Sequence, residues 1–281
     1  MGGTSGLSLA SGDVDRDGQD ELLIGSGANS PDRTTGKATL VKLSMLAPGA
    51  TRLLSDASLP SVVFCSSDQD DLFGQEVAMG DVDGDMDFDA VIAAPMADDE
   101  YEDHGVVYVV YANDGVGQLW GQIVSVDSMT DVTAVVGFGL RRHLGAQAIC
   151  GDIDADGNDE VFVTMDESFD PPSALASVIV LGQLSADRPI VYASSQPCFV
   201  TSGASSGGFG KALSIADANA DGTLDLLISE PFAEVNGKFG AGFVHAFTRV
   251  TASGIGEGPV RPQKAILASY PNPFGSSASI R

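Results

Sequence analysis

The feature that most constrains this chain is an acidic loop that occurs four times. The third copy occupies residues 152–160 and reads DIDADGNDE. Its carboxylates at positions 1, 3 and 5 converge on one point, the glycine at position 6 permits a tight turn, position 7 can lend a backbone carbonyl, and the acid at position 9 closes the ring. Hard oxygen ligands in this number suit Ca²⁺. The copies begin at Asp13, Asp81, Asp152 and Asp217, at intervals of 68, 71 and 65 residues.

Each interval contains the same order of short segments. A small turn pair opens it, and a short alternating segment leads into the acidic loop. An apolar strand follows the loop, then a second strand of alternating pattern, then a looser last strand. The turn pairs are Phe73-Gly74, Leu144-Gly145, Phe209-Gly210 and a weak Ser5-Gly6. The strands expected after the loops are 21–25, 89–93, 160–164 and 225–229; the second strands 37–43, 105–111, 177–181 and 242–247; the last strands 61–65, 122–126 and 198–201.

Four short strands in each repeat, and no sustained helical period, predict an all-β protein. A four-stranded unit cannot bury both of its faces alone, so the units must stack on their neighbours. Radial stacking gives a β-propeller, whose strands are covered on both faces and therefore read as continuous apolar runs. A linear β-solenoid is the competing arrangement, but its coils are much shorter than these repeats. We therefore expect an incomplete propeller segment of four four-stranded blades.

The EF-hand is the other common calcium loop that begins Asp-x-Asp-x-Asp-Gly. It requires a bidentate glutamate at position 12 and a helix on each side. Position 12 is apolar in every copy here, being Ile24, Ile92, Val163 and Ile228. The sequence therefore predicts a metal turn between two strands.

The order Phe-Gly, acidic loop and Ala-Pro resembles the FG-GAP repeat of the integrin α-subunit β-propeller and its bacterial relatives, over about residues 3–250. In that family each repeat is a blade and the loop binds Ca²⁺, so the resemblance implies up to four calcium ions. The ligands that it implies are Asp13, Asp15, Asp17, Gln19 and Glu21; Asp81, Asp83, Asp85, Asp87 and Asp89; Asp152, Asp154, Asp156, Asn158 and Glu160; and Asp217, Asn219, Asp221, Thr223 and Asp225.

Two copies depart from this pattern. Met86 replaces the loop glycine of the second copy, so a residue with a side chain must adopt positive φ there. Asn219 replaces one carboxylate of the fourth copy, and we expect that loop to bind calcium most weakly.

The formal net charge of −25 argues against nucleic acid or an anionic membrane as a partner. No apolar run approaches the roughly 18 residues that a membrane-spanning helix needs. The three cysteines, Cys65, Cys150 and Cys198, form neither a disulfide framework nor a zinc pattern. One bridge or three buried thiols are both compatible with their positions.

The repeats end near residue 250, and residues 251–264 are predicted to form a linker. The segment Tyr270-Pro271-Asn272-Pro273-Phe274 resembles the opening strand of an Ig-like C-terminal domain that directs type IX secretion in some bacteria. This resemblance implies that 265–281 is the truncated start of such a domain, which would engage the secretion machinery. The N-terminus lacks the features of a signal peptide. We therefore expect a chain truncated at both ends.

Candidates for catalysis are weak. The letters of Gly203-Ala204-Ser205-Ser206-Gly207 match a nucleophile elbow, but the expected strand–helix context is missing. The histidines lie in different repeats, at His104, His143 and His245, and His143 follows the basic pair Arg141-Arg142. Trp120, Tyr101, Tyr108 and Tyr111 could line a recognition surface, although strand aromatics usually pack in cores. We therefore expect no enzyme.

The sequence favours a secreted or cell-surface module that binds protein or glycan ligands in adhesion, without membrane insertion. A hydrolase or lyase that carries a propeller is the rival class, and a spacer in a large surface protein is a third. Convergent acids away from the metal loops would favour the hydrolase or lyase, and absence of a concave aromatic or charged patch would favour the spacer.

Overall fold

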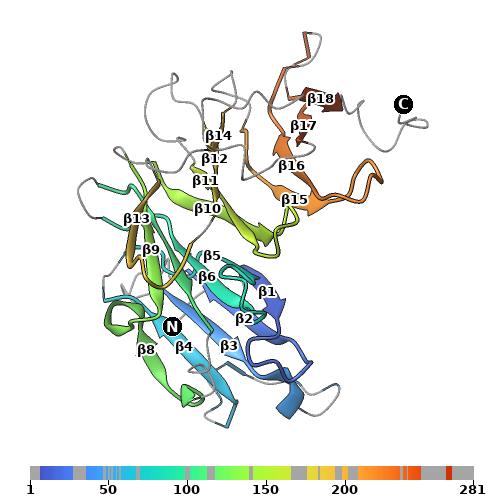
Figure 1. Cartoon of the computed structure of the whole chain (residues 1–281). Coiled ribbons are helices and arrows are strands. Elements are labelled where there is room, and N and C mark those ends of the chain that lie inside the picture. The colour runs from blue at the N-terminus through green and yellow to red at the C-terminus, as the bar shows by residue number, and fades with distance from the viewer. Residues whose placement is uncertain are drawn as a thin grey trace.

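The computed structural model is all-β (Figure 1). It describes residues 7–27, 36–46, 58–67, 70–98, 102–112, 118–138, 142–165, 176–182, 184–193, 208–234 and 240–247, with residues 49, 51, 53, 54, 56, 237 and 238, and the backbone of 198–201 and 264–267. The described residues contain no α-helix, and the 3₁₀ turns that they describe in full are η1 (Leu43–Met45) and η3 (Val126–Ser128). No helix in the described part of the chain is long and apolar enough to span a membrane.

The described strands form four sheets, and each sheet contains four antiparallel strands in chain order. Sheet 1 is built from β1 (Leu9–Gly12), β2 (Glu21–Ser26), β3 (Lys37–Val41) and β4 (Ser61–Cys65). Sheet 2 has β5 (Glu76–Gly80), β6 (Asp89–Ala94), β7 (Val106–Val110) and β9 (Val132–Val136). Sheet 3 has β10 (Leu144–Gly151), β11 (Glu160–Met165), β12 (Ser177–Leu181) and β14 (Cys198–Thr201). Sheet 4 has β15 (Leu213–Ala216), β16 (Asp225–Glu230), β17 (Phe243–Phe247) and β18 (Lys264–Leu267).

One strand assignment from the sequence is wrong. Residues 122–126 do not supply the last strand of the second repeat. Their strand β8 (Ile123–Ser125) instead pairs in parallel with β4 of sheet 1, and β9 takes the expected place beside β7. Strand β13 (Ile190–Tyr192) likewise pairs in parallel with β9 of sheet 2. Each of these two strands therefore adds a fifth strand to the sheet that precedes it in the chain. The local alternation of apolar residues carries no information about the distant strand with which each of them pairs.

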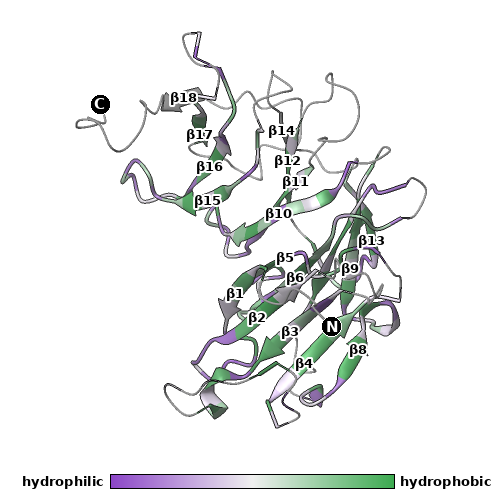
Figure 2. Cartoon of the chain, turned by 180° about the vertical axis from the view of Figure 1, so that it is seen from behind, coloured by the Kyte–Doolittle hydropathy of each residue, from purple (hydrophilic) through white to green (hydrophobic). Residues whose placement is uncertain are grey.

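Three apolar cores lie between consecutive sheets. Leu23 and Phe64 of sheet 1 pack with Ile92 of sheet 2 in the first core. Val91 and Ala93, which point to the other face of β6, pack against sheet 3 in the second core. Phe162 of sheet 3 belongs to a third core that it shares with sheet 4. Sheet 2 and sheet 3 are thus covered on both faces, which confirms the reason given for the continuous apolar runs, and Figure 2 shows the strands as mainly hydrophobic.

The Phe-Gly turn pairs anchor each sheet to the one before it. Phe73 and Leu144 are completely buried in the first and second cores. The glycine that follows Leu144, Gly145, has φ of 93°, and a Cβ built on it would lie 2.7 Å from the Cβ of Ala93 in sheet 2. Glycine is therefore required both for its backbone conformation and for the close approach of the two sheets. Ser5-Gly6 lies outside the described residues.

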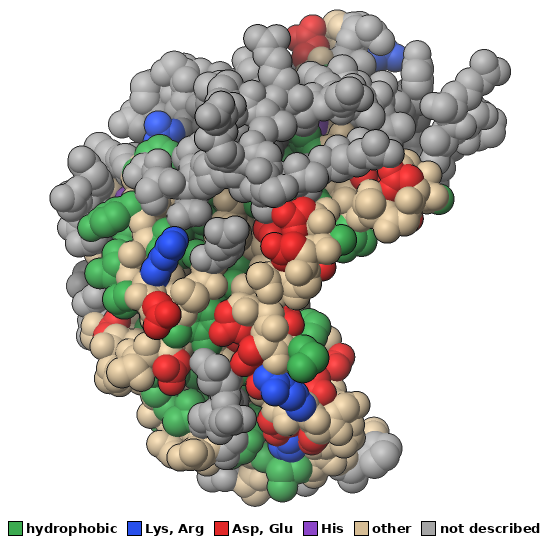
Figure 3. All heavy atoms as spheres, in the orientation of Figure 1, with side chains coloured by type: hydrophobic (Ala, Val, Ile, Leu, Met, Phe, Trp, Pro, Cys, Tyr) green, Lys and Arg blue, Asp and Glu red, His purple; other side chains and the backbone are tan. Residues whose placement is uncertain are grey.

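The sheets follow one another round an arc. The first strands contact one another in sequence, since β5 lies beside both β1 and β10, and β10 also contacts β15. Figure 3 shows the molecule hollowed on one side, with acidic side chains gathered along that side.

Residues 265–267 of the expected C-terminal domain lie in β18, which pairs with β17 and completes sheet 4. The rest of 265–281, and all of 251–263, lie outside the described residues. The domain boundaries therefore stay predictions.

Candidate metal centres

Each acidic loop connects the first strand of a sheet to its second strand. The four connections are residues 13–20, 81–88, 152–159 and 217–224. Because a strand stands on each side of every loop, the predicted position of the acidic loop as a turn between two strands is confirmed for all four copies. We call these connections loops 1 to 4.

The aspartate at position 1 holds the loop backbone together. Asp152 accepts hydrogen bonds from the backbone N–H groups of Asp156 and Gly157, both at 3.1 Å. Asp217 does the same with Asp221 and Gly222, both at 3.0 Å. In loop 1, Asp13 accepts from Asp15 at 3.4 Å, Asp17 at 3.2 Å and Gly18 at 2.8 Å, and Asp81 accepts from Met86 at 3.0 Å in loop 2. These hydrogen bonds therefore curve the backbone of each loop around its position 1 carboxylate.

The acid at position 9 clamps the start of the loop. One of its oxygens accepts a hydrogen bond from the backbone N–H at position 2, in the pairs Val14–Glu21 at 3.2 Å, Val82–Asp89 at 3.0 Å, Ile153–Glu160 at 3.1 Å and Ala218–Asp225 at 3.1 Å. All four acids are almost completely buried. Asp89 also accepts from Ala112 N at 2.9 Å with its second oxygen. The sequence predicted the position 9 acids as ligands and missed this structural role.

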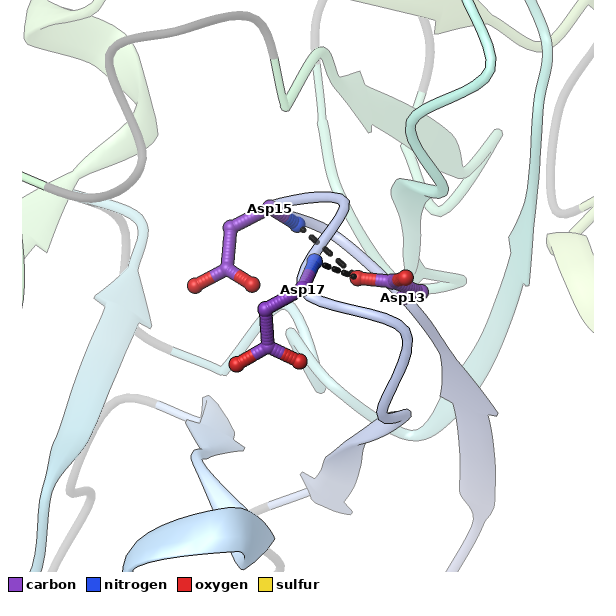
Figure 4. Close-up of side chains that lie close together, drawn as sticks. All are labelled: Asp13, Asp15 and Asp17. Carbon is purple, nitrogen blue, oxygen red and sulfur yellow. Dashed lines mark hydrogen bonds between the residues drawn. The ribbon is translucent and has the colours of Figure 1, made fainter.

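Three loops bring three acids together. Oxygen atoms of Asp13, Asp15 and Asp17 lie within 4.8 Å of one another, as do those of Asp81, Asp83 and Asp85, and those of Asp152, Asp154 and Glu160. Figure 4 shows Asp15 and Asp17 projecting to the same side of loop 1, while their N–H groups donate to Asp13. These groups contain nine of the expected ligands and match the donor set that Ca²⁺ prefers.

Loop 4 forms no such group of three acids within the described residues, since Asn219 stands where the other loops have aspartate. Asp221 N lies 2.8 Å from Asn219 Oδ1, so the amide oxygen accepts the hydrogen bond within the turn. Asp221 Oδ1 accepts from both the N–H and the hydroxyl of Thr223, at 3.0 and 2.5 Å. The expected weaker binding by loop 4 stays a prediction.

The remaining expected ligands are placed less directly. Asn158 directs its side chain against loop 2, because a Cβ built on Gly84 would lie 1.9 Å from Asn158 Oδ1. Asp156 accepts from Asn158 N at 2.9 Å, just as Asp17 accepts from Gln19 N at 3.0 Å and Asp85 from Asp87 N at 2.9 Å. A role as carbonyl ligands for Gln19, Asp87, Asn158 and Thr223 stays a prediction.

Each loop needs positive φ at two positions. Met86 has φ of 73°, which confirms that a residue with a side chain takes this conformation at position 6 of loop 2. Position 4 is also left-handed, at Arg16, Gly84, Ala155 and Ala220, with φ between 54° and 77°. The sequence did not reveal position 4, because three of these residues are not glycine. Each loop thus places one glycine at one of its two left-handed positions.

Burial makes the ionised form of these carboxylates unfavourable unless a cation is bound. Burial, supported by the charges of Asp85 and Asp81, raises the pKa of Asp83. Burial also raises the pKa of Glu160 to about 7 and that of Asp89 to about 8. Asp81 Oδ1 and Asp83 Oδ1 are buried and accept no hydrogen bond. A divalent cation would satisfy these oxygens, so the residues present fit Ca²⁺.

Among the described residues, Lys42 and Arg16 are basic residues that contact the acidic loops. Lys42 follows β3, and its Nζ lies 2.9 Å from Asp17 Oδ2 and 3.6 Å from Glu21 Oε1, with a closer contact to Asp15. Burial works to lower the pKa of Lys42, but the hydrogen bonds to Asp15 and Asp17 raise it above its ordinary value. Arg16 of loop 1 reaches loop 2, with its Nε 2.6 Å from Asp87 Oδ1. Neither contact could be predicted from local sequence patterns.

Neighbouring loops are hydrogen-bonded to one another. Phe88 N of loop 2 donates to Asp13 O of loop 1 at 3.0 Å. Asp159 N of loop 3 donates to Asp81 O at 2.7 Å, and Asp81 N donates back to Asp159 Oδ2 at 2.9 Å. An ion that orders one loop would therefore also support the sheet beside it.

The other candidates from the sequence lie in the packed interior or outside the described residues. His104 and His143 are buried, and His245 lies 2.7 Å from Glu230 with its ring 5.3 Å from that of Phe209. Cys65 and Cys150 are free thiols. Tyr108 packs its ring 5.6 Å from Phe73, and Tyr111 is buried. Residues 203–207, Tyr101, Arg141 and the Cys198 side chain lie outside the described residues.

Comparisons with known proteins agree with part of this description. Nothing in them supports the sorting domain expected at 265–281. No curated protein matches the chain. Residues 5–41, which contain loop 1 and strands β1 to β3, match the family model of the FG-GAP repeat.

Proposed function

We propose that the four sheets are consecutive blades of a β-propeller and that the chain is a calcium-binding module without enzymatic activity. In this proposal it is secreted or held at a cell surface, where it binds protein or glycan ligands in adhesion. The observation that carries the proposal is the position of the acidic loops. All four connect the first and second strands of their sheets, and three of them gather three acids each.

The propeller arrangement is supported by the repeated packing of the sheets. Each sheet packs on the next through a separate core, and the first strands contact one another along the arc. Four-stranded sheets that pack face to face in chain order, with their first strands next to one another, have the arrangement of propeller blades. The match of residues 5–41 to the FG-GAP repeat supports the same assignment.

Calcium would neutralise the loops and hold their two flanking strands in register. The residues that would hold it are Asp81, Asp83 and Asp85 in loop 2, and Asp152, Asp154 and Glu160 in loop 3. Loop 4 would use Asp217, Asn219, Asp221 and Asp225, of which Asp225 Oδ1 is buried without a hydrogen bond. The backbone bonds to positions 1 and 9 already curve the loops, so little rearrangement is needed.

An extracellular location suits this kind of site. Calcium sites in extracellular modules can have dissociation constants as weak as roughly 10⁻⁴ to 10⁻³ M and still be filled by the calcium outside cells. The net charge of −25 would also be reduced by bound cations, which lowers the repulsion between neighbouring loops.

The proposal is tested by measuring ligand binding and stability together. The immobilised chain is exposed to a glycan array and to a panel of extracellular matrix proteins, in calcium, in magnesium and in EGTA. We expect at least one ligand that binds in calcium and dissociates in EGTA, and a melting temperature that rises with calcium. A melting temperature unmoved by EGTA, with no calcium-dependent ligand, would refute the proposal. Cleavage products from any of these ligands would favour the hydrolase or lyase instead.

A further inference from the structure

Loop 1 holds the ammonium group of Lys42 among its acids. The Nζ atom of Lys42 contacts acids at positions 3, 5 and 9, namely Asp15, Asp17 and Glu21. These are three of the positions whose oxygens converge on the expected ion. The lysine side chain is only 15% exposed, so it is an internal part of the loop.

The equivalent position in the other sheets carries no charge. Strand register aligns Val41 of sheet 1 with Val110 of sheet 2 and Leu181 of sheet 3, because each pairs with the residue after the position 9 acid. The next residues are therefore equivalent, and they are Lys42, Tyr111 and Gly182. Tyr111 is buried, with its hydroxyl 3.1 Å from Thr133 Oγ1, and Gly182 has no side chain. Among these three loops, only loop 1 has a lysine at this position, whereas the basic side chain that reaches loop 2 is Arg16, which contacts Asp85 and Asp87.

Lys42 is held in this place by contacts outside the loop. Its backbone N–H donates to Pro60 O at 2.9 Å. Its Nζ lies 5.7 Å from the centre of the Trp120 ring, a distance at which a cation is attracted to the face of the indole. Trp120 precedes β8, the strand that the chain adds to the edge of sheet 1. The fifth strand of sheet 1 therefore brings the aromatic ring that helps to position the lysine.

We infer that the ammonium group of Lys42 and a calcium ion compete for loop 1, so that this loop is stabilised without calcium and binds the ion more weakly than loop 3. One oxygen of loop 1, Asp15 Oδ1, is buried and accepts no hydrogen bond, so the loop keeps a free ligand atom for an ion when the lysine moves away. The inference rests on the proposed calcium sites, and it makes Lys42 a residue that sets which loops respond to calcium.

The test uses the position of Trp120, the single tryptophan of the chain. Terbium replaces calcium in oxygen sites, and its luminescence is sensitised by a nearby indole. Excitation at the red edge of the tryptophan absorption therefore reports on loop 1 in particular. The terbium titration is repeated with Lys42→Met and Lys42→Gln, and with Lys37→Met as a control that removes the same charge from an exposed site at the other end of β3.

We expect both Lys42 variants to reach half of the sensitised signal at a terbium concentration at least tenfold lower than the wild type or Lys37→Met. The signal should be displaced by calcium, and the additional substitution Asp15→Asn should abolish the gain. Equal titration curves for wild type and both Lys42 variants would overturn the inference.

Two further measurements distinguish failure of this inference from failure of the proposed calcium sites and from poor folding of a Lys42 variant. Calorimetric titration with calcium reports binding by all loops, so absent heat in every variant would overturn the proposed calcium sites themselves. Melting in EGTA covers the case in which a Lys42 variant folds poorly. The inference requires the variants to melt lower than Lys37→Met in EGTA and to gain more from calcium, and equal shifts would contradict it.

Discussion

Replacing Glu160 by glutamine should change the stability of the protein in opposite directions with and without calcium. Glu160 is 2% exposed, and its oxygen lies within 4.8 Å of oxygens of Asp152 and Asp154. Glutamine has the same shape and can still accept the hydrogen bond from Ile153 N. The substitution therefore removes one charge from the group and leaves the backbone clamp in place.

The size of the effect follows from the repulsion between the carboxylates. Two like charges 4.8 Å apart repel by about 0.9 kcal/mol at the dielectric constant of water and by about 3.5 kcal/mol at an effective value of 20. Asp152 and Asp154 are half-buried, so we take about 1–3 kcal/mol for the total relief. At roughly 2–4 °C for each kcal/mol, the melting temperature in EGTA should rise by about 2–12 °C.

In calcium the wild type should instead melt at a higher temperature than the Glu160→Gln variant. An ion at one hundred times its dissociation constant stabilises the folded state by about 2.7 kcal/mol, and the variant loses a charged ligand for that ion. Differential scanning calorimetry at a pH above 8, where Glu160 is ionised, measures both states, with Glu234→Gln at an exposed site as the matched control. A variant that melts below the wild type in EGTA, or that gains as much from calcium as the wild type, would refute the reasoning.

Three further predictions follow from the same contacts. In EGTA the free energy of unfolding should fall as the pH rises from about 4 to about 8. Burial raises the pKa of Asp89 to about 8 and that of Glu160 to about 7, so the folded protein binds more protons than the unfolded chain in this range. Urea titrations that show stability rising with pH over this range would contradict the prediction. Met86→Gly should raise the stability by about 1 kcal/mol, because Met86 has φ of 73° and a side chain that is 74% exposed; Met86→Ala serves as the control for loss of the side chain, and an equal gain from alanine would count against the backbone explanation. Gly145→Ala should cost more than Gly157→Ala by roughly 1–3 kcal/mol in chemical denaturation, because both have positive φ but only Gly145 would bring a Cβ within 2.7 Å of sheet 2; equal losses would show that close packing of the sheets is not the reason for the glycine.

The repeat order was predictable because its signals are local. The spacing of Asp152, Asp154 and Asp156, with Glu160 four residues later, lies within one loop, and the apolar strand follows directly. The continuous apolar run of β6 also predicted that both of its faces are covered, which the two cores on either side of it confirm. The left-handed conformation of Met86 could be predicted in the same way, since the other loops have glycine there.

The features that could not be predicted depend on distant partners. Residues 123–125 and 132–136 have similar apolar content, and only the packed structure shows that the first joins sheet 1 and the second joins sheet 2. Lys42 stands 27 residues after Asp15 at the end of a strand, where a lysine usually faces solvent. The clamp between Glu160 and Ile153 was also missed, because an acid beside a metal loop was interpreted only as a ligand.

The central claim is that the gathered carboxylates of loops 2 and 3 each hold a calcium ion. Anomalous diffraction from crystals grown in calcium tests this most directly, since it locates the ion and its ligands together. We predict one anomalous peak within bonding distance of Asp81, Asp83 and Asp85, and a second within bonding distance of Asp152, Asp154 and Glu160. Crystals soaked in millimolar calcium that show no peak in either loop would contradict the account.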